Sequence, residues 1–87
     1  MRPVTITDNS NHSGVEVLRG VAIYEDAGAA AMVWLRKASA SGQKLIPVPL
    51  AAGEAVFLGL DGTPIPSEGG VYVEVVSGSI DGVLYGD

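Results

Sequence analysis

The chain ends in "EGGVYVEVVSGSIDGVLYGD" (Glu68–Asp87), and this stretch decides the fold class. Valine occupies every second position at the start of Val71–Val76, and Ile80–Tyr85 alternates in the same way. A period of two residues is the pattern of a β-strand whose side chains point to opposite faces. The Ser77–Gly78 pair between the two segments is typical of a tight turn. We therefore expect a β-hairpin that closes the domain.

The second face of this expected hairpin is unusually apolar. It carries Tyr72, Val76, Val83 and Tyr85. The solvent-facing side of an antiparallel sheet normally holds more polar residues than that. The pattern therefore predicts that part of this face packs against another molecule.

The rest of the chain shows short apolar segments between turns. Strands are expected in "RPVTITD", "VEVLRGVAIY", "KLIPVPL" and "AAGEAVFLGL", with a short bridge at Ile65 and a polar loop at "NSNHSG". Pro47 and Pro49 lack amide donors, so their strand is expected at a sheet edge. In "VEVLRGVAIY" the alternation places Val17 and Val21 on one face and Leu18 on the other. The Arg19–Gly20 pair interrupts this row and indicates a β-bulge or an interior edge.

The segment "AAAMVWLRK" (residues 29–37) has two competing predictions. Its alanines favour a helix, whereas Val-Trp-Leu and the flanking Gly28 and Gly42 favour a strand. We favour a strand. Because both of its faces are largely apolar, we expect it to be central in a sheet or covered by another subunit.

These segments predict an all-β fold. About seven or eight strands without a helix fit a small antiparallel β-sandwich, Ig-like or jelly-roll-like, with a small barrel as the alternative. The 87 residues form one expected domain, with residues 1–13 as an extended N-terminal strand or arm followed by a loop.

The composition favours a chain that buries surface against a partner. It is 47% hydrophobic and only 17% charged, with a mean hydropathy of +0.33 and no cysteine. No apolar run approaches the ~20 residues of a membrane span, and the N-terminus lacks the apolar stretch of a signal peptide. The net charge of −5, with five basic residues, argues against direct nucleic-acid binding. We expect a homo-oligomer, with a trimer favoured, and no membrane partner.

The sequence offers no recognisable catalytic, cofactor or metal site. His12 is the single histidine, and the spacing shows no further metal ligands around it. Most carboxylates fall at expected turns, where they are ordinary hydrogen-bond acceptors: Asp8, Glu25, Asp26, Asp61, Glu68 and Asp87. Glu16 and Glu74 fall within strands, where an outward solubilising charge is expected. We therefore predict that the protein is not an enzyme and needs no cofactor.

Four aromatic residues allow one alternative function. Trp34, Tyr72, Tyr85 and Tyr24 could together form a stacking platform for a sugar. Aromatic residues at alternating strand positions more commonly belong to a core or an interface. A small carbohydrate-binding module therefore stands as an alternative.

The order of the segments resembles small virion proteins of tailed bacteriophages. The resemblance covers about residues 14 to 87 and lies in "GVEVLRGVAIYEDAGAAAMVWLRKASASGQKL", "IPVPLAAGEAVFLG" and the closing stretch. It implies a capsid decoration (cement) protein that binds the major capsid protein on the outer face of the head and stabilises it. It further implies a location on the virion, with assembly in the host cytoplasm. A phage tail or head-fibre component is the alternative within the same class. The resemblance supplies no catalytic residues and assigns no interface residues.

Overall fold

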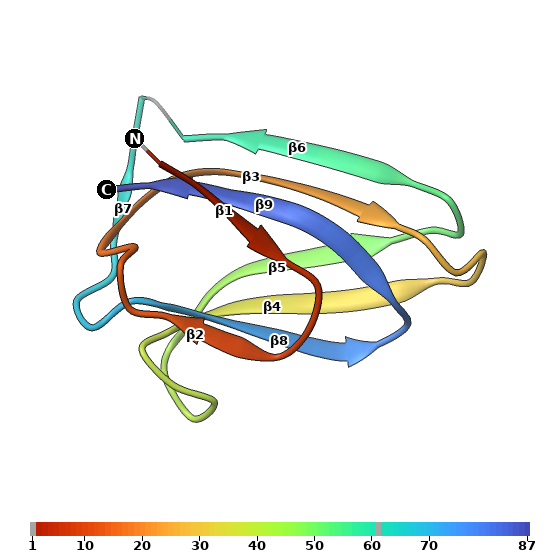
Figure 1. Ribbon diagram of the computed structural model, residues 1–87, viewed down its shortest axis with the longest axis horizontal. Helices are drawn as coiled ribbons and strands as arrows, with labels where there is room; N and C mark the ends of the chain where they lie inside the picture. The colour runs from red at the N-terminus through yellow and green to blue at the C-terminus, as the bar shows by residue number, and fades with distance from the viewer. Residues whose placement is uncertain (1, 61) are drawn as a thin grey trace.

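The computed structural model describes residues 2–60 and 62–87, which form nine β-strands in two sheets and contain no helix (Figure 1). Asp61, one of the carboxylates expected at a turn, lies outside the described residues. The strands are β1 (Arg2–Ile6), β2 (Ser10–His12), β3 (Val17–Glu25), β4 (Ala31–Lys37), β5 (Lys44–Leu50), β6 (Ala55–Gly59), β7 (Ile65–Pro66), β8 (Val71–Ser77) and β9 (Ile80–Gly86).

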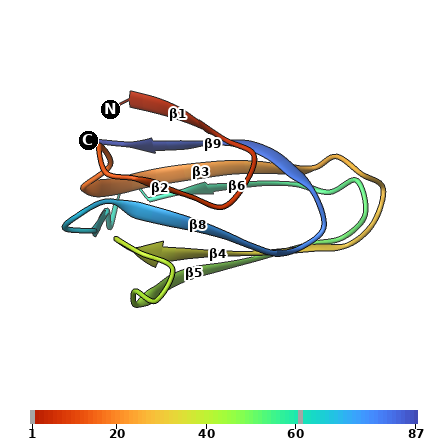
Figure 2. The ribbon, with the colours of Figure 1, turned by 60° about the horizontal axis from the view of Figure 1, so that its bottom comes forward.

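The two antiparallel sheets face one another as a β-sandwich, which confirms the predicted fold class (Figure 2). One sheet, called sheet A, has the order β1-β9-β3-β6, with the short β7 beside β3. The other, sheet B, has the order β2-β8-β4-β5. The two sheets are open and have separate edges, so the fold is not the small barrel that the sequence left as an alternative.

The strand pairing is that of a jelly roll. β1 pairs with β9, β2 with β8, β3 with β6 and β4 with β5, as in one long hairpin. The hairpin is rolled up so that β3 also pairs with β9, and β4 with β8. An Ig-like sandwich instead keeps its first two strands in one sheet. The topology therefore selects the jelly-roll alternative.

The core lies between the sheets and is built from the inward side chains of both. Because strand side chains alternate, β4 shows the pattern most clearly: Ala31, Val33 and Leu35 are buried, and the residues between them are half-buried. The remaining buried apolar residues are Ile6, Val15, Leu18, Val21, Ile23, Val48, Leu50, Val71, Val73, Ile80 and Leu84. Within the described ranges no helix is long and apolar enough to cross a membrane.

The bulge expected at Arg19–Gly20 is confirmed, but its consequence for the strand face was predicted wrongly. The register of β3 against β9 shifts between Leu18 and Gly20. The extra residue resets the alternation, so that Leu18 and Val21 both point into the core and are fully buried. The prediction that Val17 and Val21 share one face of the strand is therefore wrong, and Val17 is only half-buried.

The closing hairpin expected at Ser77–Gly78 is also wrong. Both strands exist, but β8 belongs to sheet B and β9 to sheet A. Gly78 carries the chain from one sheet to the other with a left-handed backbone φ of 81°. A Cβ at this position would lie 2.6 Å from the Ala31 Cβ. Glycine is therefore required for the crossing rather than for a two-residue hairpin.

Other local predictions have mixed outcomes. The segment 29–37 contains a strand, β4, in the interior of sheet B, and the proline-containing β5 lies at its edge, as expected. The bridge at Ile65 is present as β7. The polar loop "NSNHSG" is wrong in part, because Ser10–His12 pairs with β8 as β2.

The N-terminal segment pairs within the chain. Arg2–Ile6 forms β1 at the edge of sheet A, antiparallel to β9, and Ile6 is 1% exposed. In the described structure this segment is part of the sandwich and is not an extended arm.

Candidate functional site

The outer face of sheet B carries a group of large side chains on its two interior strands. Met32, Trp34 and Arg36 alternate with core residues along β4, and Tyr72 lies directly opposite Arg36 on β8. All four are half-buried. Pro47 on the neighbouring β5 lies opposite Trp34 and is exposed. We call these five residues the sheet B patch.

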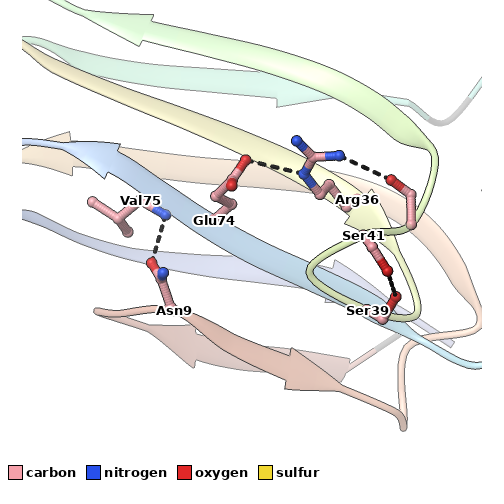
Figure 3. A network of polar contacts seen from close by, with 7 residues as sticks. Asn9, Arg36, Ser39, Ser41, Glu74 and Val75 are labelled. Atoms are coloured by element: carbon pink, nitrogen blue, oxygen red, sulfur yellow. Dashed lines mark hydrogen bonds and ion pairs between the residues drawn. The ribbon is translucent and has the colours of Figure 1, made fainter.

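The polar groups of this face are paired with one another. The Arg36 Nε donates to Glu74 Oε1 over 3.0 Å, and its Nη1 donates to the Gly42 carbonyl (Figure 3). The Lys44 ammonium lies 4.5 Å from the centre of the Trp34 ring, which is a cation–π contact. These contacts hold Arg36 and Trp34 in defined positions. Side chains that are fixed before binding lose less entropy when a partner covers them.

Asn9 fixes the edge of the same sheet. Its Oδ1 accepts a hydrogen bond from the Val75 amide over 2.7 Å, which ties the connection between β1 and β2 to β8 (Figure 3). The exposed Val76 follows directly, at the point where the register of β4 against β8 shifts.

The outer face of sheet A is different, because it is hollowed. Tyr24 is 49% exposed and Phe57 is 69% exposed, on the adjacent strands β3 and β6. Ala22 lies next to both, two residues before Tyr24 on β3 and opposite Phe57 on β6 and Val83 on β9. The small alanine leaves an open hollow of about 470 Å³ that is lined by these four residues, together with Thr5, Asp81 and parts of the backbone. We call it the sheet A hollow.

Glu25 fixes one end of this hollow. It follows Tyr24 at the end of β3 and is fully buried. Its carboxylate accepts hydrogen bonds from the Gly53 amide at 2.7 Å, the Ala27 amide at 2.7 Å and the Gly28 amide at 2.9 Å. These turns connect β5 to β6 and β3 to β4, so one side chain ties both connections to β3.

The same hydrogen bonds set the charge state of Glu25. The Gly53 amide holds the pKa of Glu25 below its ordinary value, against burial, which acts to raise it, and the Ala27, Ala29 and Gly28 amides add to the lowering. The expectation that the carboxylates near turns serve as backbone acceptors is confirmed here. Glu25 itself, however, belongs to the last position of β3.

The other polar residues considered from the sequence are placed apart. His12 lies on β2, where its Nε2 is 2.9 Å from the Ser10 hydroxyl, and burial lowers its pKa. Among the described residues no three His, Asp or Glu side chains come together as a metal site. Glu74 faces outward and pairs with Arg36, whereas the exposed Glu16 precedes β3. Asp87 pairs with Arg19.

The four aromatic residues expected as one sugar platform are divided between the two faces. Trp34 and Tyr72 belong to sheet B, and Tyr24 and Tyr85 to sheet A. The single four-residue platform is therefore wrong. Phe57, which was not among these four, is the most exposed large apolar residue that the structure describes, and its ring lies 6.4 Å from that of Tyr85 at an angle of 60°. The segment "AVFLG" is apolar throughout, so its sequence does not indicate which of its side chains face outward.

Comparison of the chain with protein-family models, with curated proteins and with solved structures finds no match. The functional argument therefore depends on the two outer faces themselves.

Proposed function

We propose that this protein is a non-enzymatic structural protein of a tailed-bacteriophage virion, a capsid decoration (cement) protein that binds the outer face of the head and stabilises it. The observation that carries the proposal is the sheet B patch. A jelly roll alone does not decide the function, because the same fold serves capsid and lectin domains alike.

The composition of the patch supports a protein partner. Aromatic residues, methionine and arginine are enriched where protein surfaces meet, and tryptophan, tyrosine and arginine dominate the binding energy. Trp34, Tyr72 and Arg36 lie on adjacent strands, with Arg36 directly opposite Tyr72. The exposed prolines of β5 extend the patch as a rigid surface. Together they form a surface with the composition of a protein-binding face.

Basic residues are concentrated near the patch, where Glu74 partly offsets them. The chain has a net charge of −5, yet three of its five basic residues, Arg36, Lys37 and Lys44, lie on β4 and β5. On the outer face Arg36 is paired with Glu74, and Lys44, opposite Arg36 on β5, lies over the Trp34 ring. We assign the outer surface of the major capsid protein as the occupant of the patch.

We further propose a homo-oligomer on the head, with a trimer favoured, because association would bury more of the apolar outer surface. Light scattering of the free protein tests this part. A particle of three chains supports it, and a monomer at micromolar concentration contradicts it.

Electron microscopy of virions mixed with gold-labelled protein tests the location. The proposal predicts label over the head at regular lattice positions. Label confined to the tail would support the tail or fibre alternative and contradict decoration. The position of the gene provides an independent check, because a neighbouring major capsid gene is expected.

A further inference from the structure

The sheet A hollow is an open depression on the outer face of sheet A. Phe57 and Tyr24 line it, and the small Ala22 lies directly opposite Phe57 and two residues before Tyr24 on β3. Its volume of about 470 Å³ falls within the range of about 300–1,000 Å³ that is usual for ligand sites. The two sheets form separate layers (Figure 2), and the hollow is lined by residues of sheet A alone, so it lies on the other sheet from the sheet B patch. Binding at the hollow would therefore be compatible with docking through sheet B.

The chemistry of the lining combines two kinds of group. Phe57 and Tyr24 present aromatic surface, with exposed fractions of 69% and 49%. Thr5 and Asp81, from β1 and β9, bring a hydroxyl and a carboxylate to the same hollow, and both residues are exposed. A pyranose ring needs both features, because its C–H face packs on an aromatic ring while its hydroxyl groups need hydrogen-bond acceptors.

The charge of the lining restricts the ligand further. None of the described residues that line the hollow is basic, and Asp81 is the acidic one. The chain as a whole carries a net charge of −5. Phosphates, sulfated sugars and uronic acids would lack a cationic partner and would meet a carboxylate instead. A neutral sugar suits the hollow better than an anionic one.

The hollow is held in shape before any ligand arrives. The Phe57 ring contacts the Tyr85 ring, and Tyr85 packs over Gly20, where a Cβ would lie 3.8 Å from the Tyr85 ring. Tyr24 directly precedes the buried Glu25, whose three backbone contacts fix that end of β3. A site whose side chains are positioned in advance loses less free energy on binding.

From this geometry we infer that the sheet A hollow is a binding site for a neutral pyranose residue of an oligosaccharide or polysaccharide. Phe57 and Tyr24 pack against the sugar ring, and Asp81 and Thr5 accept hydrogen bonds from its hydroxyl groups. The inference is independent of capsid binding, which uses the opposite sheet.

Nuclear magnetic resonance titration of the ¹⁵N-labelled chain tests the site. The probes are neutral oligosaccharides of glucose, mannose, galactose, xylose and N-acetylglucosamine, each raised to millimolar concentration, with oligogalacturonate as the anionic counterpart. We expect saturable shifts for amides of β3, β6 and β9 with at least one neutral probe, and weaker or no shifts with oligogalacturonate. Shifts centred on Trp34, or no saturable shift with any neutral probe, would overturn the inference.

Three variants locate the binding. Phe57→Ala and Asp81→Ala should each weaken binding by about tenfold, the effect of one lost aromatic or hydrogen-bonding contact. Trp34→Ala is the matched aromatic control on the opposite face and should leave sugar binding unchanged. Sugar binding that survives Phe57→Ala, or that Trp34→Ala removes, contradicts the site.

A dilution series of the free protein distinguishes a second copy of the chain as the occupant. The site predicts that the amides of the hollow keep their positions on dilution. Shifts of these amides on dilution, with no response to sugars, would assign the hollow to self-association and overturn the inference. The two proposals fail separately. If Trp34→Ala loses head binding but the unmodified protein binds no sugar, the sugar site is refuted and the proposed function stands.

Discussion

Leu35 and Phe57 provide a direct test of which side of each sheet forms the core. Phe57 has the larger side chain, but it is 69% exposed, whereas Leu35 has no exposed surface. If residue size alone set the effect of truncation, Phe57→Ala would be the more damaging change. If the two sheets pack as described, the order is reversed.

The magnitudes follow from the buried areas. A Leu→Ala change in a packed core costs about 2–5 kcal/mol, and we expect about 3 kcal/mol for Leu35. An aromatic side chain offers about 200 Å², and the buried third of Phe57 is about 60 Å², or at most about 1.5 kcal/mol. A domain of this length is stable by about 4–13 kcal/mol in total. Leu35→Ala therefore removes a large share of the stability and Phe57→Ala a small one.

Urea unfolding followed by fluorescence measures both variants, because Trp34 is the single tryptophan of the chain. Leu35→Ala should lower the midpoint at least twice as far as Phe57→Ala, with similar slopes for all three proteins. Equal losses, or a greater loss for Phe57→Ala, would refute the assignment of faces on which both proposed surfaces depend.

Three further predictions concern the turns, the ionised core and the first strand. Hydrogen bonds hold the pKa of Glu25 below its ordinary value of 4.5, so its stabilising contribution is present above that pH and is lost as the pH falls through the lower folded pKa. Glu25→Gln should therefore destabilise the protein at pH 7 and make its unfolding free energy less dependent on pH in the acid range. An unchanged pH dependence would contradict this. Gly78→Ala should lower the unfolding free energy by more than about 1 kcal/mol, because the φ of Gly78 is 81° and an added Cβ would meet Ala31. Gly62→Ala is the control with a mild expected effect, because nothing lies within 4 Å of an added Cβ there. Equal effects of the two changes would exclude a steric cause. Deletion of residues 1–7 should abolish cooperative thermal unfolding in calorimetry, because it removes β1 and the buried Ile6. An intact unfolding transition would show instead that the fold does not need β1.

Much of the local structure follows from the sequence, whereas the assembly of the strands does not. The Val-Trp-Leu run outweighed the alanines of residues 29–37, and Pro47 and Pro49 correctly marked an edge strand. A period of two, however, says only that a segment is extended. It cannot say whether the next strand pairs with it or crosses to the other sheet, which is why β8 and β9 were expected as a hairpin.

The same limit applies to the candidate sites. The alternation indicated on which face of its own strand each aromatic residue lies. It did not indicate that Trp34 and Tyr72 belong to one sheet and Tyr24 and Tyr85 to the other. The bulge in β3 changed the face of Leu18, because one extra residue reverses the alternation. Phe57 lies in a short segment whose residues are almost all apolar, and its exposure depends on how β6 is placed at the edge of sheet A.

The central claim is that the outer face of sheet B binds the head of a phage, and co-sedimentation with purified heads that lack the protein tests it most directly. Trp34→Ala should weaken binding by at least about 2 kcal/mol, or roughly thirtyfold, as expected for a tryptophan at the centre of an interface. Phe57→Ala, the control on the opposite face, should bind as the unmodified protein does. Undiminished binding by Trp34→Ala, or equal losses in the two variants, would contradict the assignment of sheet B as the docking face.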